Sequence, residues 1–196
     1  MLQLPVYLLI WEMLLIKKED MKMGFDLYGL SHTDVEDKYS GEIEGVYFRN
    51  NVWWWRPLSE YIIKHTEQIS EDDEDIWNYN DCREVPEGVA IGIAVKLQEL
   101  VDSGHTAKYA KDWNTMVADA EIWNKGVEKL LEKLKKRVIK KSGNKHIAPN
   151  DYPTIDKLEW DRLYSTKESG AYYDFTVDNV KEFISFARKS GGFKIC

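Results

Sequence analysis

The sequence predicts an α+β fold in which a small sheet from N-terminal and C-terminal strands is packed by several helices, with one long protruding heptad helix. The stretch "MGFDLYGL" alternates apolar Phe25 and Leu27 with Asp26 and Tyr28, which is the period of a half-buried strand. The chain ends in "FKIC", a short strand that we expect to pair with the first. The segments between them repeat apolar residues at intervals of three and four, as amphipathic helices do.

Composition limits the classes of protein that are possible. With 196 residues and 43% apolar content the chain can form a real core, and we expect one α+β domain over residues 23–196. The net charge of −7 argues against general nucleic-acid binding, although it is compatible with a local basic patch. Two distant cysteines, Cys82 and Cys196, predict neither a disulfide framework nor a metal-ligand pair. A reducing cytosol is the simplest interpretation.

The first residues of the chain need a separate interpretation. "MLQLPVYLLIWEMLLI" is mostly apolar, but it is short for a membrane span and is interrupted by Pro5 and Glu12. Lys17 and Lys18 follow this run and no small-residue cleavage site comes after it, so we expect neither a secretory signal nor a membrane anchor. The stretch "KKEDMKM" can be encoded by a purine-rich ribosome-binding sequence. Residues 1–22 are therefore expected to be a non-native leader or, alternatively, an apolar N-terminal helix.

The stretch "NNVWWWRPL" places three tryptophans in a row, and three consecutive side chains cannot share one buried face of a helix or strand. Because proline disfavours helical geometry at the residue before it, we predict that Trp53–Arg56 forms a turn or extended segment. A helix is then expected from Pro57 to about Thr66. In an extended segment Trp54 points away from its two neighbours, so Trp54 is predicted to be the exposed indole, with Arg56 on its side.

Capping residues and periodicity predict three further helices. One begins near Pro86 and ends before Gly104, and another follows the N-cap Thr176. The longest is expected from about 106 to 141, because apolar residues recur there at alternating spacings of four and three. Its seam consists of Tyr109, Trp113, Met116, Ala120, Trp123, Val127, Leu130 and Leu134.

A single helix cannot bury this seam alone. We expect Val127, Leu130 and Leu134 to pack either against a second copy of the chain, as a coiled-coil homodimer, or against a neighbouring segment. Several lysines surround the end of the predicted helix, and we interpret them as a complement to the negative end of the helix dipole.

Four stretches together resemble a family of small proteins from phages and bacterial genomes. They are "MGFDLYGL", "YFRNNVWWWRPL", "YNDC…LQELVDSG" and "FTVDNVKEFISFARKSGGF", and together they cover about half of the chain. The family has no established activity. The resemblance therefore implies a phage or prophage source, and hence the cytoplasm of a bacterial host, but no reaction. Many relatives carry a zinc-ribbon-like pair of Cys-x-x-Cys motifs, whereas this chain has no cysteine between Cys82 and Cys196, so no zinc site is carried over.

The candidate ligand-binding residues are Arg49, Asn50, Asn51, Trp54 and Arg56. Indole faces stack on nucleobases and guanidinium groups pair with phosphate, so these residues suit a planar, anionic, nucleotide-like ligand. Two other interpretations stay open: the residues support the core and a turn, or they form a hot spot for a host protein. We therefore expect a non-enzymatic accessory binding protein of a phage or prophage.

No catalytic set is visible, and we predict no catalytic residue, metal or cofactor. The sequence has no phosphate loop, nucleophile elbow or paired histidines at helical spacing. The histidines are dispersed and expected to be solvated: His32, His65, His105 and His146. One alternative is a small enzyme that acts on such a ligand through Asp26, Asp81 or a histidine. The other is a structural interaction protein that dimerises through the heptad helix.

Overall fold

The computed structural model describes residues 24–32, 43–70, 77–168 and 173–196, so the prediction for residues 1–22 lies outside the described residues. The predicted α+β class is confirmed, because strands from both ends of the chain join one sheet that helices cover. The chain divides into two compact units. Unit 1 comprises Met1–Lys111 and Tyr173–Cys196, and unit 2 comprises Asp112–Tyr172.

The sheet of unit 1 has the strand order β2-β1-β4-β3, and every neighbouring pair is antiparallel. Its strands are β1 (Gly24–Gly29), β2 (Tyr47–Asn51), β3 (Arg83–Pro86) and β4 (Gly192–Ile195). Leu27 of β1 lies opposite Ile195 of β4, which confirms the predicted pairing of the two chain ends. The sequence does not predict strand β3. Its four residues, REVP, include only one buried side chain, Val85, so they show no alternation of apolar and polar residues.

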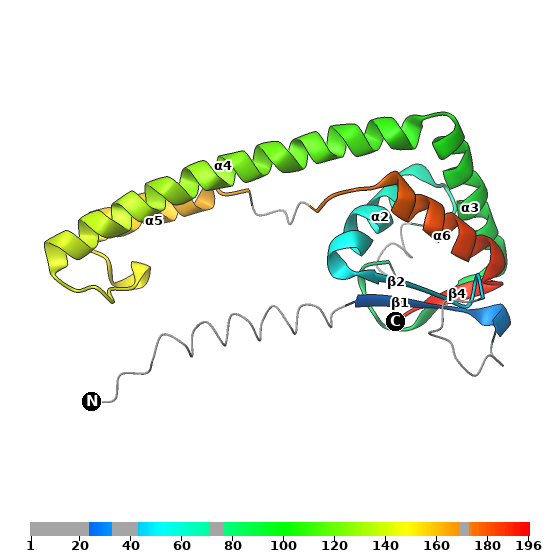
Figure 1. Cartoon of the computed structure of the whole chain (residues 1–196). Coiled ribbons are helices and arrows are strands. Elements are labelled where there is room, and N and C mark those ends of the chain that lie inside the picture. Colours follow the sequence, from blue (N-terminus) through cyan, green and yellow to red (C-terminus); the bar gives the residue numbers. More distant parts are fainter. Residues whose placement is uncertain (1–23, 33–42, 71–76, 169–172) are drawn as a thin grey trace. The chain divides into compact units, whose positions relative to one another are not determined.

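Three helices of unit 1 pack on the same face of this sheet (Figure 1). They are α2 (Val52–His65), α3 (Glu87–Asp102) and α6 (Val177–Lys189), and the short 3-10 helix η1 (Leu30–His32) follows β1. Helix α3 begins after Pro86 and is followed by Gly104 at a φ of 77°, as predicted. The core between helices and sheet is rich in aromatic residues, and its largest fully buried side chains include Trp55, Trp77, Tyr61, Phe183 and Phe193.

The start of α2 corrects the prediction that Trp53–Arg56 is a turn or extended segment. The Asn51 side chain accepts hydrogen bonds from the backbone N–H groups two and three residues later, both at 3.0 Å. It thereby caps a helix that begins at Val52. Pro57 is the sixth residue of this helix, so its missing N–H removes one hydrogen bond of the helical backbone and the helix nevertheless continues to His65. The N-cap thus outweighs the extended preference of the residue before proline.

The turn between α6 and β4 depends on two glycines. Gly191 and Gly192 have φ values of 66° and 88°, in the left-handed region that side chains disfavour. A Cβ atom on Gly191 would also clash with the side chain of Ser31, and one on Gly192 would approach the carbonyl of Val85. The "SGG" of the sequence therefore does more than end a helix, since it allows β4 to enter the middle of the sheet.

Unit 2 contains most of α4 (His105–Ser142), the 3-10 helix η3 (Pro149–Asp151) and α5 (Thr154–Ser165). The long helix has ends within one residue of those predicted. Helix α5 runs back along the second half of α4 (Figure 1), and Arg137 joins the two helices by ion pairs to Asp156 at 2.8 Å and to Glu159. Asn124 and the backbone of Glu168 exchange two hydrogen bonds at the other end of the hairpin.

The buried stripe of α4 differs in part from the predicted heptad seam. Met116, Trp123 and Leu130 are exposed, the last at 47%. The buried stripe consists of Ala110, Val117, Ala120, Val127, Leu131, Leu134 and Val138. A straight α-helix drifts relative to a strict seven-residue repeat, so the buried positions move by one residue along its length.

This packing corrects the expectation that Val127, Leu130 and Leu134 are left for a second copy of the chain. Val127 and Leu134 are 4% and 2% exposed within a single chain. Leu134 belongs to a cluster with Val138 and Tyr152, against which Trp160 of α5 packs. The alternative of a neighbouring segment is the one found, because α5 and the loop before it cover Leu134.

A disulfide joins Cys82 and Cys196, which overturns the expectation that these cysteines form no bridge. Their separation of 114 residues is large, yet β3 and β4 place them side by side. The backbone N–H of Cys82 donates to the carbonyl of Ile195 at 2.9 Å, just beside the bridge. Sheet topology brings the cysteines together, and sequence distance alone could not reveal it. The cysteine content therefore no longer favours a reducing cytosol.

Candidate functional site

A hollow of about 480 Å³ in unit 1 brings together four of the five predicted ligand-binding residues. Arg49, Asn50 and Asn51 come from the end of β2, and Trp54 comes from the first turn of α2. The first turns of α6 form the other wall, and the sequence does not show that they lie next to Trp54. The lining residues of this wall are Thr176, Asp178, Asn179 and Glu182. The site thus lies where β2 and the N-termini of two helices meet.

Asparagine side chains hold these elements together. The Asn50 amide nitrogen donates to the Asn179 amide oxygen at 3.0 Å, and the Asn179 amide nitrogen donates to the Trp54 carbonyl at 3.3 Å. Asn50 is 8% exposed, so its amide needs these partners. The signal for Asn179 is present in the sequence, since an asparagine stands where a capping box has Glu or Gln. We conclude that the asparagines fix the geometry of the hollow.

The three tryptophans separate into three environments because successive helical residues are about 100° apart. Trp55 is fully buried, and its indole N–H donates to the Trp77 carbonyl at 2.7 Å. Trp53 is half-buried against Tyr173, with ring centroids 4.2 Å apart. Trp54 is 39% exposed and lines both the site and a neighbouring hollow of about 260 Å³ that Trp53 and Tyr173 also line. Trp54 is therefore the exposed indole, as predicted, although on a helix.

Charges of both signs line the site. The Arg49 guanidinium lies 3.5 Å from the Asp26 carboxylate, which also accepts a hydrogen bond from Tyr47. Burial and this hydrogen bond raise the pKa of Tyr47 above its usual value, so its hydroxyl stays protonated. Asp178 and Glu182 contribute two carboxylates on the α6 side. The N-termini of α2 and α6 add partial positive charge. The site can consequently offer donors and acceptors to a polar ligand.

Arg56 lies elsewhere, which corrects its predicted position beside Trp54. Two residues along a helix are separated by about 200°, so the two side chains point to different sides of α2. Arg56 lines a separate hollow of about 530 Å³ together with Glu60, Lys64 and Tyr79. The structure therefore assigns Arg49 alone, of the two predicted arginines, to the hollow that contains Trp54.

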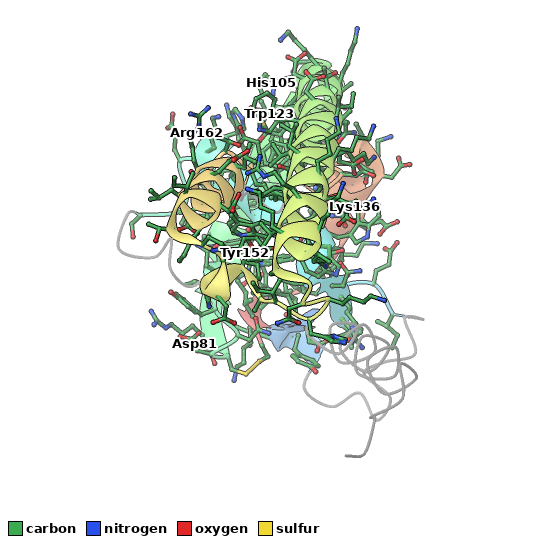
Figure 2. All side chains as sticks on the ribbon, turned by 90° about the vertical axis from the view of Figure 1, so that its left-hand side faces the viewer. Asp81, His105, Trp123, Lys136, Tyr152 and Arg162 are labelled. Carbon is green, nitrogen blue, oxygen red and sulfur yellow. A yellow bond between two sulfur atoms is a disulfide. The ribbon has the colours of Figure 1, made fainter. Side chains whose placement is uncertain are left out.

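The carboxylates considered for catalysis have ordinary structural partners. Asp81 forms an ion pair with Arg83 at 2.6 Å on the surface, and it is labelled near the disulfide in Figure 2. Asp26 is engaged by Tyr47 and Arg49. Within the described part of the chain, no three His, Cys, Asp or Glu side chains are grouped to hold a metal ion.

Two of the histidines meet, contrary to the expectation that all four are dispersed and solvated. The ring centroids of His65 and His105 lie 4.7 Å apart, and the Tyr61 hydroxyl lies 3.0 Å from His105 Nδ1. The His65 Nε2 atom is buried, with no hydrogen-bond partner among the described residues. Burial, the neighbouring His105 and Lys64 lower the pKa of His65. These histidines are structural parts of the contact between α2 and the start of α4 in unit 1.

No helix in the described ranges is both long enough and apolar enough to cross a membrane. Comparisons of the chain with models of protein families, with curated proteins and with solved structures found no match. The indication of function in the structure is therefore the geometry of the hollow around Trp54.

Proposed function

We propose that the protein is a non-enzymatic accessory binding protein of a phage or prophage, and that the hollow around Trp54 holds a planar, nucleotide-like anionic ligand. The phage or prophage source rests on the four sequence stretches that resemble that family. The observation that carries the binding proposal is an exposed indole beside a guanidinium and a hydrogen-bonded asparagine framework, all in one hollow.

The exposed indole supports recognition of a planar group. An indole that is 39% exposed on a rigid first helical turn gives up little conformational freedom when a base stacks on it. Base–aromatic stacking contributes about 1–3 kcal/mol per base in proteins that bind single-stranded nucleic acids. Asn51 fixes this turn by its two capping hydrogen bonds, so the backbone that carries the indole is already held in place before a ligand arrives.

The charges of the site support a ligand that carries both an anionic and a neutral polar part. Arg49 and the two helix N-termini favour an anionic group at the β2 side. The carboxylates of Asp178 and Glu182 can accept hydrogen bonds from the amino and hydroxyl groups of a nucleoside. Lys181 lies 3.8 Å from Asp178 and reduces the local negative charge. A single phosphate suits this balance better than a triphosphate.

A second candidate is a host protein that docks on the same surface. The observation in its favour is the continuity of Trp53, Trp54 and Tyr173 over two adjoining hollows, since Trp and Tyr are enriched in interface hot spots. A peptide or loop would place one apolar side chain between Trp53 and Trp54. Its polar backbone would face Asn51 and Asn179 of the first hollow.

Isothermal titration calorimetry with nucleoside monophosphates, after a thermal-shift screen, tests the ligand proposal. Trp54→Ala should abolish the binding heat while the melting temperature stays close to that of the wild type, and Trp54→Phe should restore part of the affinity. The matched pair is Arg49→Gln and Arg56→Gln, because each removes one exposed guanidinium.

Only Arg49→Gln is expected to weaken binding, by about 1.5–3 kcal/mol for a charged hydrogen bond. Equal affinities of the two arginine variants would contradict the placement of the ligand. Absence of nucleotide binding by the wild-type protein, together with capture of a host protein that Trp54→Ala loses, would favour the second candidate instead.

A further inference from the structure

The basic residues of this acidic chain are concentrated in one part of α4. Between Lys125 and Lys141 eight residues are Lys or Arg and two are Glu, whereas the whole chain has a net charge of −7. Because salt screens charges beyond about 8 Å at physiological ionic strength, a local patch rather than the net charge decides what binds there.

Five of these lysines form one stripe along the helix. Their spacings of four, four, three and four residues place them within an arc of about 80° on a helix with 100° per residue. The stripe consists of Lys125, Lys129, Lys133, Lys136 and Lys140, all of which are exposed. With a rise of about 1.5 Å per residue the stripe is about 22 Å long, with one ammonium group every 4.5–6 Å.

The stripe lies on the side of α4 opposite to the hairpin contact. The buried residues Val127, Leu131, Leu134 and Val138 point the other way, as helical periodicity requires. Figure 2 shows Lys136 on the side of α4 that faces away from α5. The stripe is therefore open to a partner without any change in the α4–α5 hairpin.

Most of the stripe is also electrostatically available. Lys125 and Lys136 pair with glutamates one helical turn away, at 3.1 and 3.5 Å, and such exposed pairs contribute little. Lys129, Lys133 and Lys140 have no ion pair with any residue in the described ranges. The helix dipole explains a few positive charges in the last turn, but its effect is confined to that turn, and Lys125–Lys133 lie well before it.

We propose that this lysine stripe binds the sugar–phosphate backbone of a nucleic acid without reading its sequence. A row of cations at this spacing complements a row of phosphates, whose contacts are sequence-independent. No apolar side chain interrupts the stripe between Lys125 and Lys140, whereas a membrane-surface helix combines its basic face with an apolar one. The inference is independent of the ligand site in unit 1.

Fluorescence anisotropy with a labelled DNA duplex of arbitrary sequence, at several salt concentrations, tests the proposal. The full-length wild type should bind at about 50 mM salt, and the slope of log K against log salt should approach −4.5 if five phosphates are neutralised. The double variant Lys129→Gln, Lys133→Gln should bind at least tenfold more weakly at low salt, with a slope shallower by about 1.8. Gln is a good helix former, so α4 should persist in circular dichroism.

The matched control is Lys96→Gln with Arg188→Gln, which removes the same charge from unit 1, at the partly exposed Lys96 and the exposed Arg188. It should bind DNA like the wild type. The proposal is overturned if both double variants lose the same affinity, if the wild type does not bind DNA at about 50 mM salt, or if it binds vesicles of anionic phospholipid and not DNA.

Discussion

At the scale of single residues, adjacent tryptophans have different roles. Trp55 stacks between Phe25 and Trp77, at centroid distances of 5.2 and 5.8 Å, and makes a buried hydrogen bond. Trp54 makes no ring contact that holds the core together among those the structure describes. The same residue type therefore stabilises the fold at one position and is available for binding at the next.

Stability measurements should separate these roles. Trp55→Ala should lower the free energy of unfolding by about 3–5 kcal/mol, because it leaves a cavity and an unpaired carbonyl in the core. Trp54→Ala should change it by less than about 1 kcal/mol, as exposed substitutions do. Urea denaturation followed by circular dichroism gives both values. If Trp54→Ala were the most destabilising change of the triplet, Trp54 would be a structural residue of the core, and this result would contradict the proposed ligand site.

The buried nitrogen of His65 predicts a loss of stability in acid. The pKa of His65 in the folded state lies below the unfolded value of about 6.5. Between these two pKa values the unfolded chain therefore binds more protons than the folded chain. The stabilisation from neutral His65 is complete above about pH 6.5 and declines as the pH falls toward the folded-state pKa.

The test is the urea midpoint at about pH 7.5 and pH 5.5. His65→Phe, which keeps the aromatic contacts with Tyr61 and Tyr109, should show a smaller difference between the two values than the wild type. The control His146→Gln, at a surface position, should behave like the wild type. An unchanged pH dependence in His65→Phe would show that other groups, such as carboxylates, dominate the acid sensitivity.

At the scale of elements, the disulfide joins the edge strand β3 to the end of β4. Reducing it, or replacing both cysteines by serine, should lower the free energy of unfolding by about 2–4 kcal/mol, because the crosslink restricts the unfolded chain. The urea midpoint of the wild type should fall on addition of reductant, whereas that of the double variant should not change. The control is to unfold the protein without reductant, treat it with an alkylating reagent and measure its mass. A mass increase of two alkyl groups would show that both cysteines are free thiols and would contradict the bridge.

The α4–α5 hairpin makes a second prediction at this scale. Leu134 is 2% exposed and Leu130 is 47% exposed, so the same substitution should have unequal effects at the two positions. Leu134→Asp buries an unpaired carboxylate and should disrupt the hairpin, with a loss of helical signal, whereas Leu130→Asp should be tolerated. Circular dichroism and hydrogen exchange of α5 measure the difference. A larger effect of Leu130→Asp than of Leu134→Asp would instead support the heptad seam predicted from the sequence, in which Leu130 is buried.

At the scale of the whole molecule, the sequence predicts what is periodic and misses what depends on distant partners. The sheet of chain ends, the helix after Pro86 and the long helix follow from alternation, caps and 3-4 spacing. Strand β3 and the Cys82–Cys196 bridge do not, because only the partner β4 brings them into the fold. The site is half predictable: the β2–α2 wall is one continuous motif, whereas the α6 wall comes from residues more than a hundred positions later.

The central claim is that a ligand stacks on Trp54, and NMR of the tryptophan indole N–H groups tests it most directly. The chain has eight tryptophans, and each gives one indole signal in a ¹⁵N-labelled sample. Titration with a nucleoside monophosphate should shift the Trp54 signal, identified by its absence in Trp54→Phe, and to a smaller extent that of Trp53. The signal of Trp55, which is buried on Trp77, should stay in place. No shift at Trp54 with any nucleotide, or shifts confined to other tryptophans such as Trp123, would contradict the account.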